Sequence, residues 1–209
     1  MRSTSALLLG FLAAALTGSA WPDAGSRGAQ VYVICGSCHG ARAEGEPRLD
    51  APSLAGLPEE YLLRQLRHFR DGIRGAGQDE QGRQMRQILL DAVPSEEDWI
   101  AVVGYIHSLP AAVPPVTLRG DRRRGAELYA SCAGCHGPRA EGNDAVKAPP
   151  LRWLPDWYIA RQVNKFGTGQ RGSAPEDVPG TQMRAAAATL HSDSDAPAVA
   201  AFIVTSLSR

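Results

Sequence analysis

The chain has 209 residues, of which 44% are hydrophobic and 21% charged, and its 22 basic and 22 acidic side chains give a net charge of zero. This length is enough for one large domain or for two domains of about 100 residues. No concentrated basic stripe with interleaved aromatic residues occurs, so we expect no binding of nucleic acid.

Residues 1–20 have the pattern of a secretory signal peptide. Arg2 precedes an apolar stretch over residues 6–16, and Gly18-Ser19-Ala20 supplies small residues for cleavage. The apolar stretch is shorter than the roughly 20 residues that span a bilayer, and no later segment is apolar enough to do so. We therefore expect a periplasmic protein, with an uncleaved signal that tethers it to the membrane as the alternative.

The pattern Cys-x-x-Cys-His occurs twice and uses all four cysteines of the chain. The copies are Cys35-Gly36-Ser37-Cys38-His39 and Cys132-Ala133-Gly134-Cys135-His136. This spacing is that of c-type haem attachment, in which both thiols add to the haem vinyl groups and the histidine binds the iron. We therefore predict two covalently bound haem c groups, with His39 and His136 as axial iron ligands.

Two other uses of these cysteines are weaker. A thioredoxin-like redox pair would need a βαβ setting, and no strand-rich pattern flanks either copy. A four-cysteine zinc site would leave the histidine after each pair without a role, twice. Export to an oxidising compartment also leaves disulfides as an alternative, but it suits covalent haem equally.

Helical patterns dominate the rest of the chain, so we predict an all-α fold. One helix is expected to lead into each motif, over residues 26–35 and 122–132. A second begins at Pro58 and again at Pro155, since proline suits the first turn of a helix. A last helix begins near Ser95 with a capping-box-like arrangement, and its counterpart begins near 192–197.

The two halves of the chain repeat one another. A shift of 97 residues, the separation of Cys35 and Cys132, brings together many identical pairs, among them Tyr61 with Tyr158. Between the halves, three prolines within six residues predict a stiff, extended connector. We therefore predict two tandem domains related by internal duplication, over 21–110 and 122–209, joined by a proline-rich linker over 111–121.

The sixth position of each iron needs a further donor. Met85 and Met183 follow their histidines at nearly equal distances, 46 and 47 residues, and we expect each on a loop before a short helix. A methionine in an apolar stretch usually fills core, but both of these have polar neighbours. We therefore predict Met85 and Met183 as the second axial ligands.

Other recurring residues have candidate roles around the haem. Pro52 and Pro149 lie 13 residues after their histidines, and their carbonyl groups would accept the imidazole N–H and orient the ring. Arg74 and Arg171 follow a helix beside glycine, where a guanidinium group suits a haem propionate; an ordinary solvated arginine is the alternative.

The remaining histidines do not recur at equivalent positions in the two halves. His68 is equivalent to Lys165, His107 is equivalent to Val204, and His191 has no counterpart in the repeat. We therefore expect all three on the surface or at helix ends.

The chain resembles the two-domain class I c-type cytochromes, in particular the cytochrome c4 family. The resemblance covers nearly all of the mature chain and rests on the two haem motifs, on Pro52-Ser53-Leu54-Ala55-Gly56, on Phe69-Arg70-Asp71-Gly72-Ile73-Arg74, and on the two methionines. It implies two cytochrome c folds about a pseudo-twofold axis, with haem edges close enough for rapid electron transfer between them. The second domain departs from it over residues 150–154.

The resemblance implies a periplasmic carrier that passes single electrons between redox proteins of a respiratory chain, such as a dehydrogenase or a terminal oxidase, and that docks to a membrane complex. Only two lysines, Lys147 and Lys165, are present, so arginine would have to serve in docking. We expect no enzymatic activity of its own. The alternatives are a cytochrome subunit of a periplasmic dehydrogenase or reductase complex and, more remotely, a dihaem peroxidase-type enzyme.

Overall fold

The computed structural model describes residues 26–208, which form α-helices and loops without a β-strand in this range. The helices are α1 (Arg27–His39), α2 (Glu59–Arg70), α3 (Glu80–Ala92), α4 (Glu96–Ser108), α5 (Arg122–His136), α6 (Asp156–Gly167), α7 (Val178–Ala187) and α8 (Asp195–Phe202). Two short 3-10 helices, η1 (Pro47–Leu49) and η2 (Asp144–Val146), and a π-helical segment, η3 (Ile203–Leu207), complete the described elements. The prediction of an all-α fold is confirmed. The predicted signal peptide lies outside the described residues, and none of the helices within 26–208 is long and apolar enough to cross a membrane.

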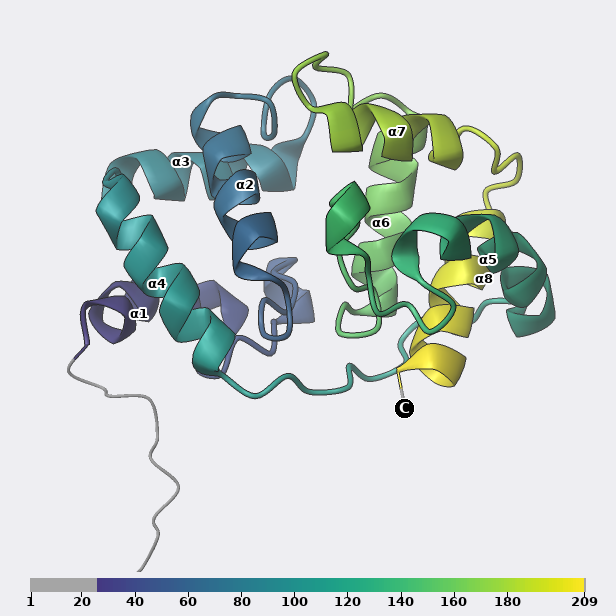
Figure 1. Ribbon diagram of the computed structural model, residues 1–209, viewed down its shortest axis with the longest axis horizontal. Coiled ribbons are helices and arrows are strands. Elements are labelled where there is room, and N and C mark those ends of the chain that lie inside the picture. Colours follow the sequence, from purple (N-terminus) through teal and green to yellow (C-terminus); the bar gives the residue numbers. More distant parts are fainter. Residues whose placement is uncertain (1–25, 209) are drawn as a thin grey trace, which may run out of the picture.

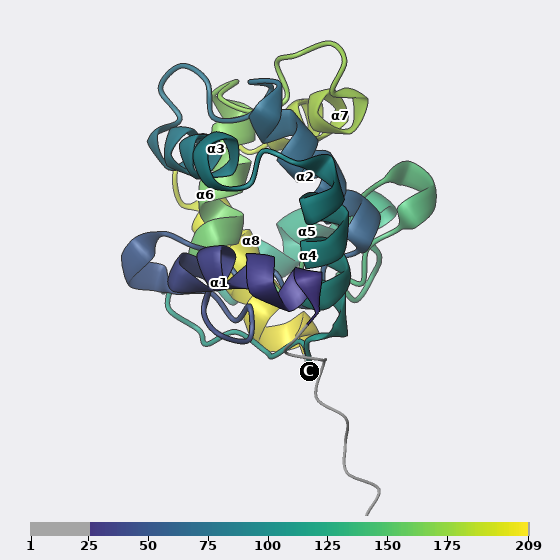
Figure 2. The ribbon, with the colours of Figure 1, turned by 90° about the vertical axis from the view of Figure 1, so that its left-hand side faces the viewer.

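The helices form two halves of the same design. Figure 1 shows α1–α4 on one side and α5–α8 on the other, joined by an extended segment that runs beneath both. In each half the helix that carries the cysteine motif packs against the last helix, α1 against α4 and α5 against α8. Figure 2 looks onto the first half and shows α1 below α2 and α3. Internal duplication about a pseudo-twofold axis is therefore seen in the fold itself.

The motif helices run further than the sequence predicted. Both were expected to end at the first cysteine, but α1 and α5 continue to the histidine of each motif. Each then stops at a glycine with a positive φ, Gly40 at 83° and Gly137 at 80°. This places both cysteines and the histidine on the last turns of one rigid helix, which fixes their mutual geometry.

Close packing of helices explains a further pair of recurring glycines. A Cβ atom at Gly28 of α1 would lie well inside contact distance of the Ala101 carbonyl oxygen and 2.8 Å from Cβ of Tyr105, both in α4. Gly125 of α5 has the same relation to Ala198 of α8. These glycines are therefore needed for the backbones to approach, rather than for backbone freedom.

The starts of α2, α4 and α6 agree in part with those predicted from the sequence. The second helices were expected to begin at Pro58 and Pro155; both prolines are N-caps, and α2 and α6 begin one residue later. Ser95 also precedes α4, but its hydroxyl donates to the Glu97 carboxylate at 2.5 Å and accepts no backbone N–H, so the expected capping box does not form.

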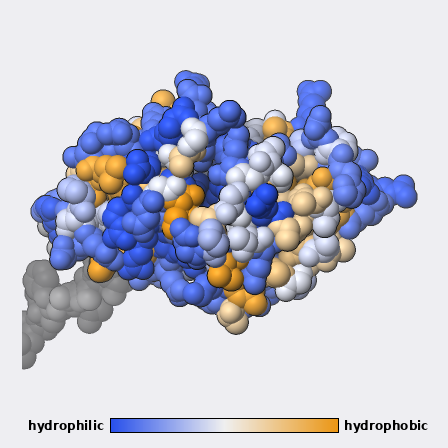
Figure 3. Space-filling view, turned by 90° about the horizontal axis from the view of Figure 1, so that it is seen from above, coloured by the Kyte–Doolittle hydropathy of each residue, from blue (hydrophilic) through white to orange (hydrophobic). Residues whose placement is uncertain are grey.

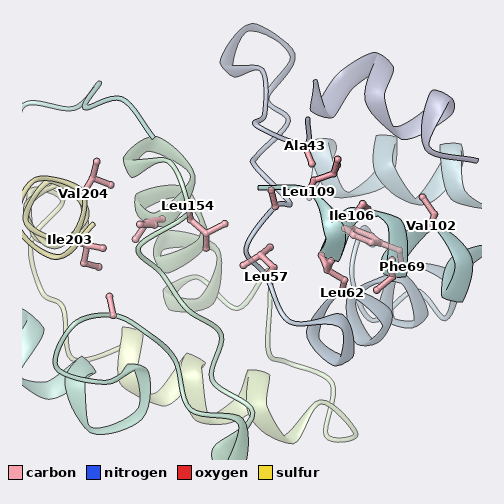
Figure 4. Close-up of a cluster of buried hydrophobic side chains, with 14 of the residues drawn as sticks. Ala43, Leu57, Leu62, Phe69, Val102, Ile106, Leu109, Leu154, Ile203 and Val204 are labelled. Carbon is pink, nitrogen blue, oxygen red and sulfur yellow. The ribbon is translucent and has the colours of Figure 1, made fainter. Parts of the chain in front are cut away.

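The apolar core is continuous across the two halves. Each half has its own buried side chains, Trp99 and Val103 in the first and Ile203 and Val204 in the second. Figure 4 shows Leu57 and Leu154, one from each half, between Ile106 and Phe69 on the side of the first half and Ile203 and Val204 on the side of the second. The halves therefore pack on one another through apolar as well as polar contacts.

The connector between the halves is extended, as predicted, and is tied to the second half by one buried carboxylate. Asp156, at the start of α6, accepts the backbone N–H groups of Thr117 and Leu118 at 2.7 and 2.8 Å and the Thr117 hydroxyl at 2.5 Å. Its side chain is fully buried. No local pattern predicts this tie, because the partners lie 38 and 39 residues away along the chain.

Replacing Asp156 by alanine is expected to lower the free energy of unfolding by about 2–3 kcal/mol, because two backbone N–H groups and the Thr117 hydroxyl lose a charged acceptor. Urea denaturation would measure the loss, and limited proteolysis would show faster cleavage within 111–121. The matched control is Asp144→Ala, which removes an exposed carboxylate from η2 and should leave both readouts unchanged. Equal stability of the two variants would contradict the structural role of Asp156.

Candidate haem sites

A large cavity lies at the end of the motif helix in each half, and residues of the other half complete its lining. The first is lined by Cys35, Cys38 and His39 of α1, by the 49–57 loop and by Met85 of α3. The second has the same plan, with Cys132, Cys135, His136 and Met183. Most of the other lining side chains are apolar, including Leu62 and Phe69 in the first cavity. The structure thus brings together, in each half, all the predicted attachment and ligand residues.

The histidine of each motif is held in one orientation. His39 is buried, and its Nδ1 lies 2.7 Å from the carbonyl oxygen of Pro52; the equivalent distance from His136 to Pro149 is 2.9 Å. A carbonyl oxygen only accepts, so Nδ1 carries the proton and Nε2 keeps a free lone pair. Burial lowers the pKa of both imidazoles, and the hydrogen bonds to the prolines offset part of this effect. A neutral imidazole with a free Nε2 is what an iron ligand requires.

The loop that carries the proline carbonyl depends on a close backbone approach. Gly45 has φ of 86°, and a Cβ atom there would lie 2.6 Å from the backbone nitrogen of Ser53. Gly142 shows the same approach to Pro150 in the second half. The hydroxyl of Tyr32 supports the end of α1 by donating to the Gly40 carbonyl at 2.6 Å, as Tyr129 does to Gly137 at 2.7 Å.

The cysteines Cys35, Cys38 and Cys132 are partly buried, and Cys135 is exposed. Burial raises the pKa of the Cys35 thiol to about 11 and also raises that of Cys132. No group of three or more metal-binding His, Cys, Asp or Glu side chains occurs among residues 26–208. The four thiols lie as two separate pairs in two cavities, which disfavours a shared four-cysteine zinc site.

The methionines differ from expectation in their local structure. Both were expected on loops before a helix, but Met85 lies inside α3 and Met183 inside α7. Each helix begins at a buried aspartate whose carboxylate accepts a backbone N–H, Asp79 from Gly82 and Asp177 from Gly180, both at 3.0 Å. The thioether is therefore carried by a capped helix whose position is fixed at its first turn.

Arg74 and Arg171 are buried and line the first and second cavity respectively. Each packs its guanidinium group on a phenylalanine ring, with 4.4 Å from Cζ to the ring centroid, and donates to a glutamine, Gln65 or Gln162, at 2.8 Å. The Nε–H of each arginine is buried without a partner among the described residues. A buried guanidinium with an unused donor suits a carboxylate, as a haem propionate would supply.

The two arginines meet where the halves pack together. Arg171 also donates to Gln65 across the boundary at 3.1 Å. Four polar side chains (Tyr61, Gln65, Tyr158 and Gln162) line both cavities, together with Leu154. Burial and the charge of Arg74 lower the pKa of Arg171. This shared group was not predicted from the sequence, although the identity of Tyr61 with Tyr158 and of Gln65 with Gln162 in the repeat was a usable signal.

His68 was expected on the surface or at a helix end. It lies in the last turn of α2, so its place at a helix end is confirmed, but it is buried in the contact between the halves, where Nδ1 lies 3.8 Å from Oδ2 of Asp177. His107 and His191 are exposed, as expected. The burial of His68 was not predictable from its neighbours in the sequence, because Arg171 and Asp177, which face it, belong to the other half of the chain.

The donor set fits a covalently attached haem in both cavities. Two thiols, an imidazole with a free Nε2 and a thioether face one apolar space, and a guanidinium donor remains unused at its edge. An apolar surround with these donors is characteristic of c-type cytochromes, which keep the iron from water and from small ligands. The fold and the paired cavities thus define a c-type cytochrome with two haem groups.

Comparison with known proteins agrees with this class. The cytochrome c family pattern matches residues 25–110 and 123–206. Cytochrome c4 from Stutzerimonas stutzeri is 31% identical over 181 residues, covering 82% of this chain and 83% of that protein. The thiosulfate dehydrogenase electron acceptor of Stutzerimonas stutzeri strain A1501 is 30% identical and covers 81% and 77% of the two chains.

A solved structure shows the same arrangement. Reduced cytochrome c4 from Pseudomonas stutzeri matches with a TM-score of 0.68 and 29% identity, over 85% of this chain and 95% of that one. The chain belongs to the cytochrome c family, as a two-domain dihaem member of the cytochrome c4 type. It carries two covalently bound haem c groups and is an electron-transfer protein.

Proposed function

We propose that this protein carries single electrons between redox partners of a respiratory chain in the periplasm, through two haems with His/Met ligation. The observation that carries the proposal is that His39 and Met85 line one largely apolar cavity, and that His136 and Met183 line the other. When bound, the haem supplies one-electron chemistry between ferric and ferrous iron. Two protein ligands per iron leave no position for a substrate, which favours a carrier over a peroxidase-type enzyme.

The surrounding residues have separate tasks in this proposal. Cys35 and Cys38, with Cys132 and Cys135, attach the two haems. The carbonyl groups of Pro52 and Pro149 hold the imidazole rings and increase their basicity as ligands. Arg74 and Arg171 neutralise propionate groups, and methionine as the second ligand raises the potential relative to a second histidine.

We infer that electrons pass between the haems inside the molecule. Four polar side chains line both cavities, and Arg171 reaches across the boundary to Gln65. Both cavities therefore approach the same buried contact between the halves. The proposed units are residues 21–110 and 122–209, joined by the linker 111–121 and exported by the signal peptide 1–20.

The partners are proposed to be redox proteins, such as a terminal oxidase or a dehydrogenase, met in solution or on a membrane complex. Seen from the side of α3 and α7, Figure 3 shows hydrophilic residues over most of the first half and more apolar and pale residues over the second. The two halves thus offer different surfaces to partners. Similarity to the thiosulfate dehydrogenase electron acceptor favours a second candidate, a cytochrome subunit dedicated to one periplasmic dehydrogenase.

The optical spectrum of the purified, oxidised holoprotein tests the ligand assignment. We expect the long-wavelength Met–Fe(III) band at the intensity of two haems. Met85→Ala and Met183→Ala should each remove half of it, because alanine supplies no donor to the iron. The matched control is Gln84→Ala, next to Met85, which should keep the full band.

Half intensity or a high-spin spectrum in the unchanged protein would contradict two closed sites. Rapid binding of CO to one reduced haem at neutral pH, or turnover of peroxide, would then favour the enzyme. Purification as a stable complex with a dehydrogenase subunit would favour the dedicated subunit over the free carrier.

A further inference from the structure

The contact between the halves departs from twofold symmetry at one pair of charged positions. Lys165 of α6 donates to Asp79, the buried residue that caps α3 in the first half. At the equivalent place, His68 of α2 faces Asp177, the buried residue that caps α7 in the second half. One capping carboxylate therefore has a permanent cation as its partner, and the other has an imidazole.

His68 is enclosed but able to change its charge. Its exposed fraction is 9%, close to the 8% of Lys165, and its Nδ1 is buried with no hydrogen-bond partner among the described residues. The charged groups that face it are Arg64 of its own helix, Asp71 and Arg74 of the following loop, and Arg171 and Asp177 of the second half. Burial lowers the pKa of His68, the Asp177 carboxylate opposes this effect, and the three arginines add to it.

The asymmetric pair is close to the haem cavities. Lys165 lines the first cavity, and Asp177 lines the second. The Asp177 carboxylate at the second cavity therefore gains a cation at His68 only when that imidazole binds a proton. At the first cavity, Lys165 supplies the equivalent charge at every pH near neutrality.

We propose that His68 is a proton-binding site coupled to the redox state of the haem in the second half. The inference rests on the proposed function. Reduction places one electron on that iron, supplied by the redox partner, and His68 takes one proton from solvent at the nitrogen that faces Asp177; no other bond forms or breaks. The added negative charge favours the protonated imidazole, and by thermodynamic linkage the proton favours the reduced haem by the same factor.

Redox titration of the holoprotein between pH 5 and 8.5 tests the coupling. We expect two one-electron steps, of which one moves to lower potential as the pH rises through the His68 pKa and then levels off. The equilibrium constant for that step should change about tenfold, which corresponds to about 59 mV. The substitution Met183→His should lower the reduction potential of the haem in the second half. The one-electron step that shifts in this variant therefore belongs to that haem.

Two substitutions of His68 separate its charge from its shape. His68→Lys introduces lysine, the residue found at the equivalent position 165 of the second half. The reduction step of the second-half haem should then stay at its high potential at all pH values. His68→Gln should hold it at the low potential, again without pH dependence. The matched control is His191→Gln, an exposed histidine whose loss should leave the pH profile unchanged.

An NMR titration of the His68 imidazole in the oxidised and reduced holoprotein gives a second readout. Its pKa should be higher in the reduced protein by the same tenfold factor in proton affinity. An equal pKa in both states, or a pH profile that persists in His68→Gln, would overturn the coupling alone. Absence of two reversible one-electron steps would instead overturn the proposed function.

Discussion

Replacing Cys132 and Cys135 by serine is expected to yield a mature protein with one haem instead of two, and with the second half unfolded. A serine hydroxyl does not form the thioether bonds that hold the haem, so the apolar cavity lined by Leu151, Ile159 and Phe166 loses its main packing partner. A domain of this size has little core without it. The haem content per protein should fall by half, with a loss of helical circular dichroism from α5–α8.

The mirrored variant, with Cys35 and Cys38 replaced by serine, should lose the other haem and the first half. Ser37→Ala is the matched control, because it changes an exposed residue between the two cysteines without removing a sulfur atom. It should keep both haems. A serine variant that retained two haems and full helicity would contradict attachment through these cysteines.

Gly28→Ala is expected to destabilise the first half by about 3 kcal/mol or more, the upper part of the range for overpacked sites. The new methyl group would meet the Ala101 carbonyl oxygen and Cβ of Tyr105, so α1 and α4 would have to separate. Separation of these helices also moves the motif at the end of α1 away from the α4 side of the cavity. Denaturant unfolding of the holoprotein would measure the loss.

Gly104→Ala provides the matched control within the same helix pair. It lies in α4, and a Cβ atom there would meet nothing within 4 Å. Alanine should stabilise this position by about 0.5–1 kcal/mol, since glycine is costly inside a helix. A similar effect of the two substitutions would show that the close approach of α1 and α4 does not depend on Gly28.

Much of the fold was predictable because its signals are local or repeated. The two Cys-x-x-Cys-His motifs are single helical turns, so five consecutive residues specify their geometry. Pro58 and Pro155 marked the starts of α2 and α6, since proline restricts the backbone wherever it occurs. The repeat doubled the weight of each observation, and it singled out Met85 and Met183 although neither has a motif of its own.

Errors arose where local signals were incomplete. The helices α1 and α5 extend to their histidines because the stop is the glycine that follows, rather than the first cysteine. Ser95 begins α4 without the expected capping bond because the Glu97 carboxylate takes its hydroxyl. The methionines lie within helices because Asp79 and Asp177 cap α3 and α7 several residues upstream.

The sequence by itself determined the all-α class, the duplication, the haem motifs and their candidate ligands, since each depends on residue type and spacing along one half. Only the tertiary structure decided which side chains of the two halves contact one another. Asp79 with Lys165, and Gln65 with Arg171, are separated by 86 and 106 residues. Their pairing depends on how two folded surfaces pack, and spacing along the chain carries no record of it. The burial of His68 beside Asp177 was hidden for the same reason.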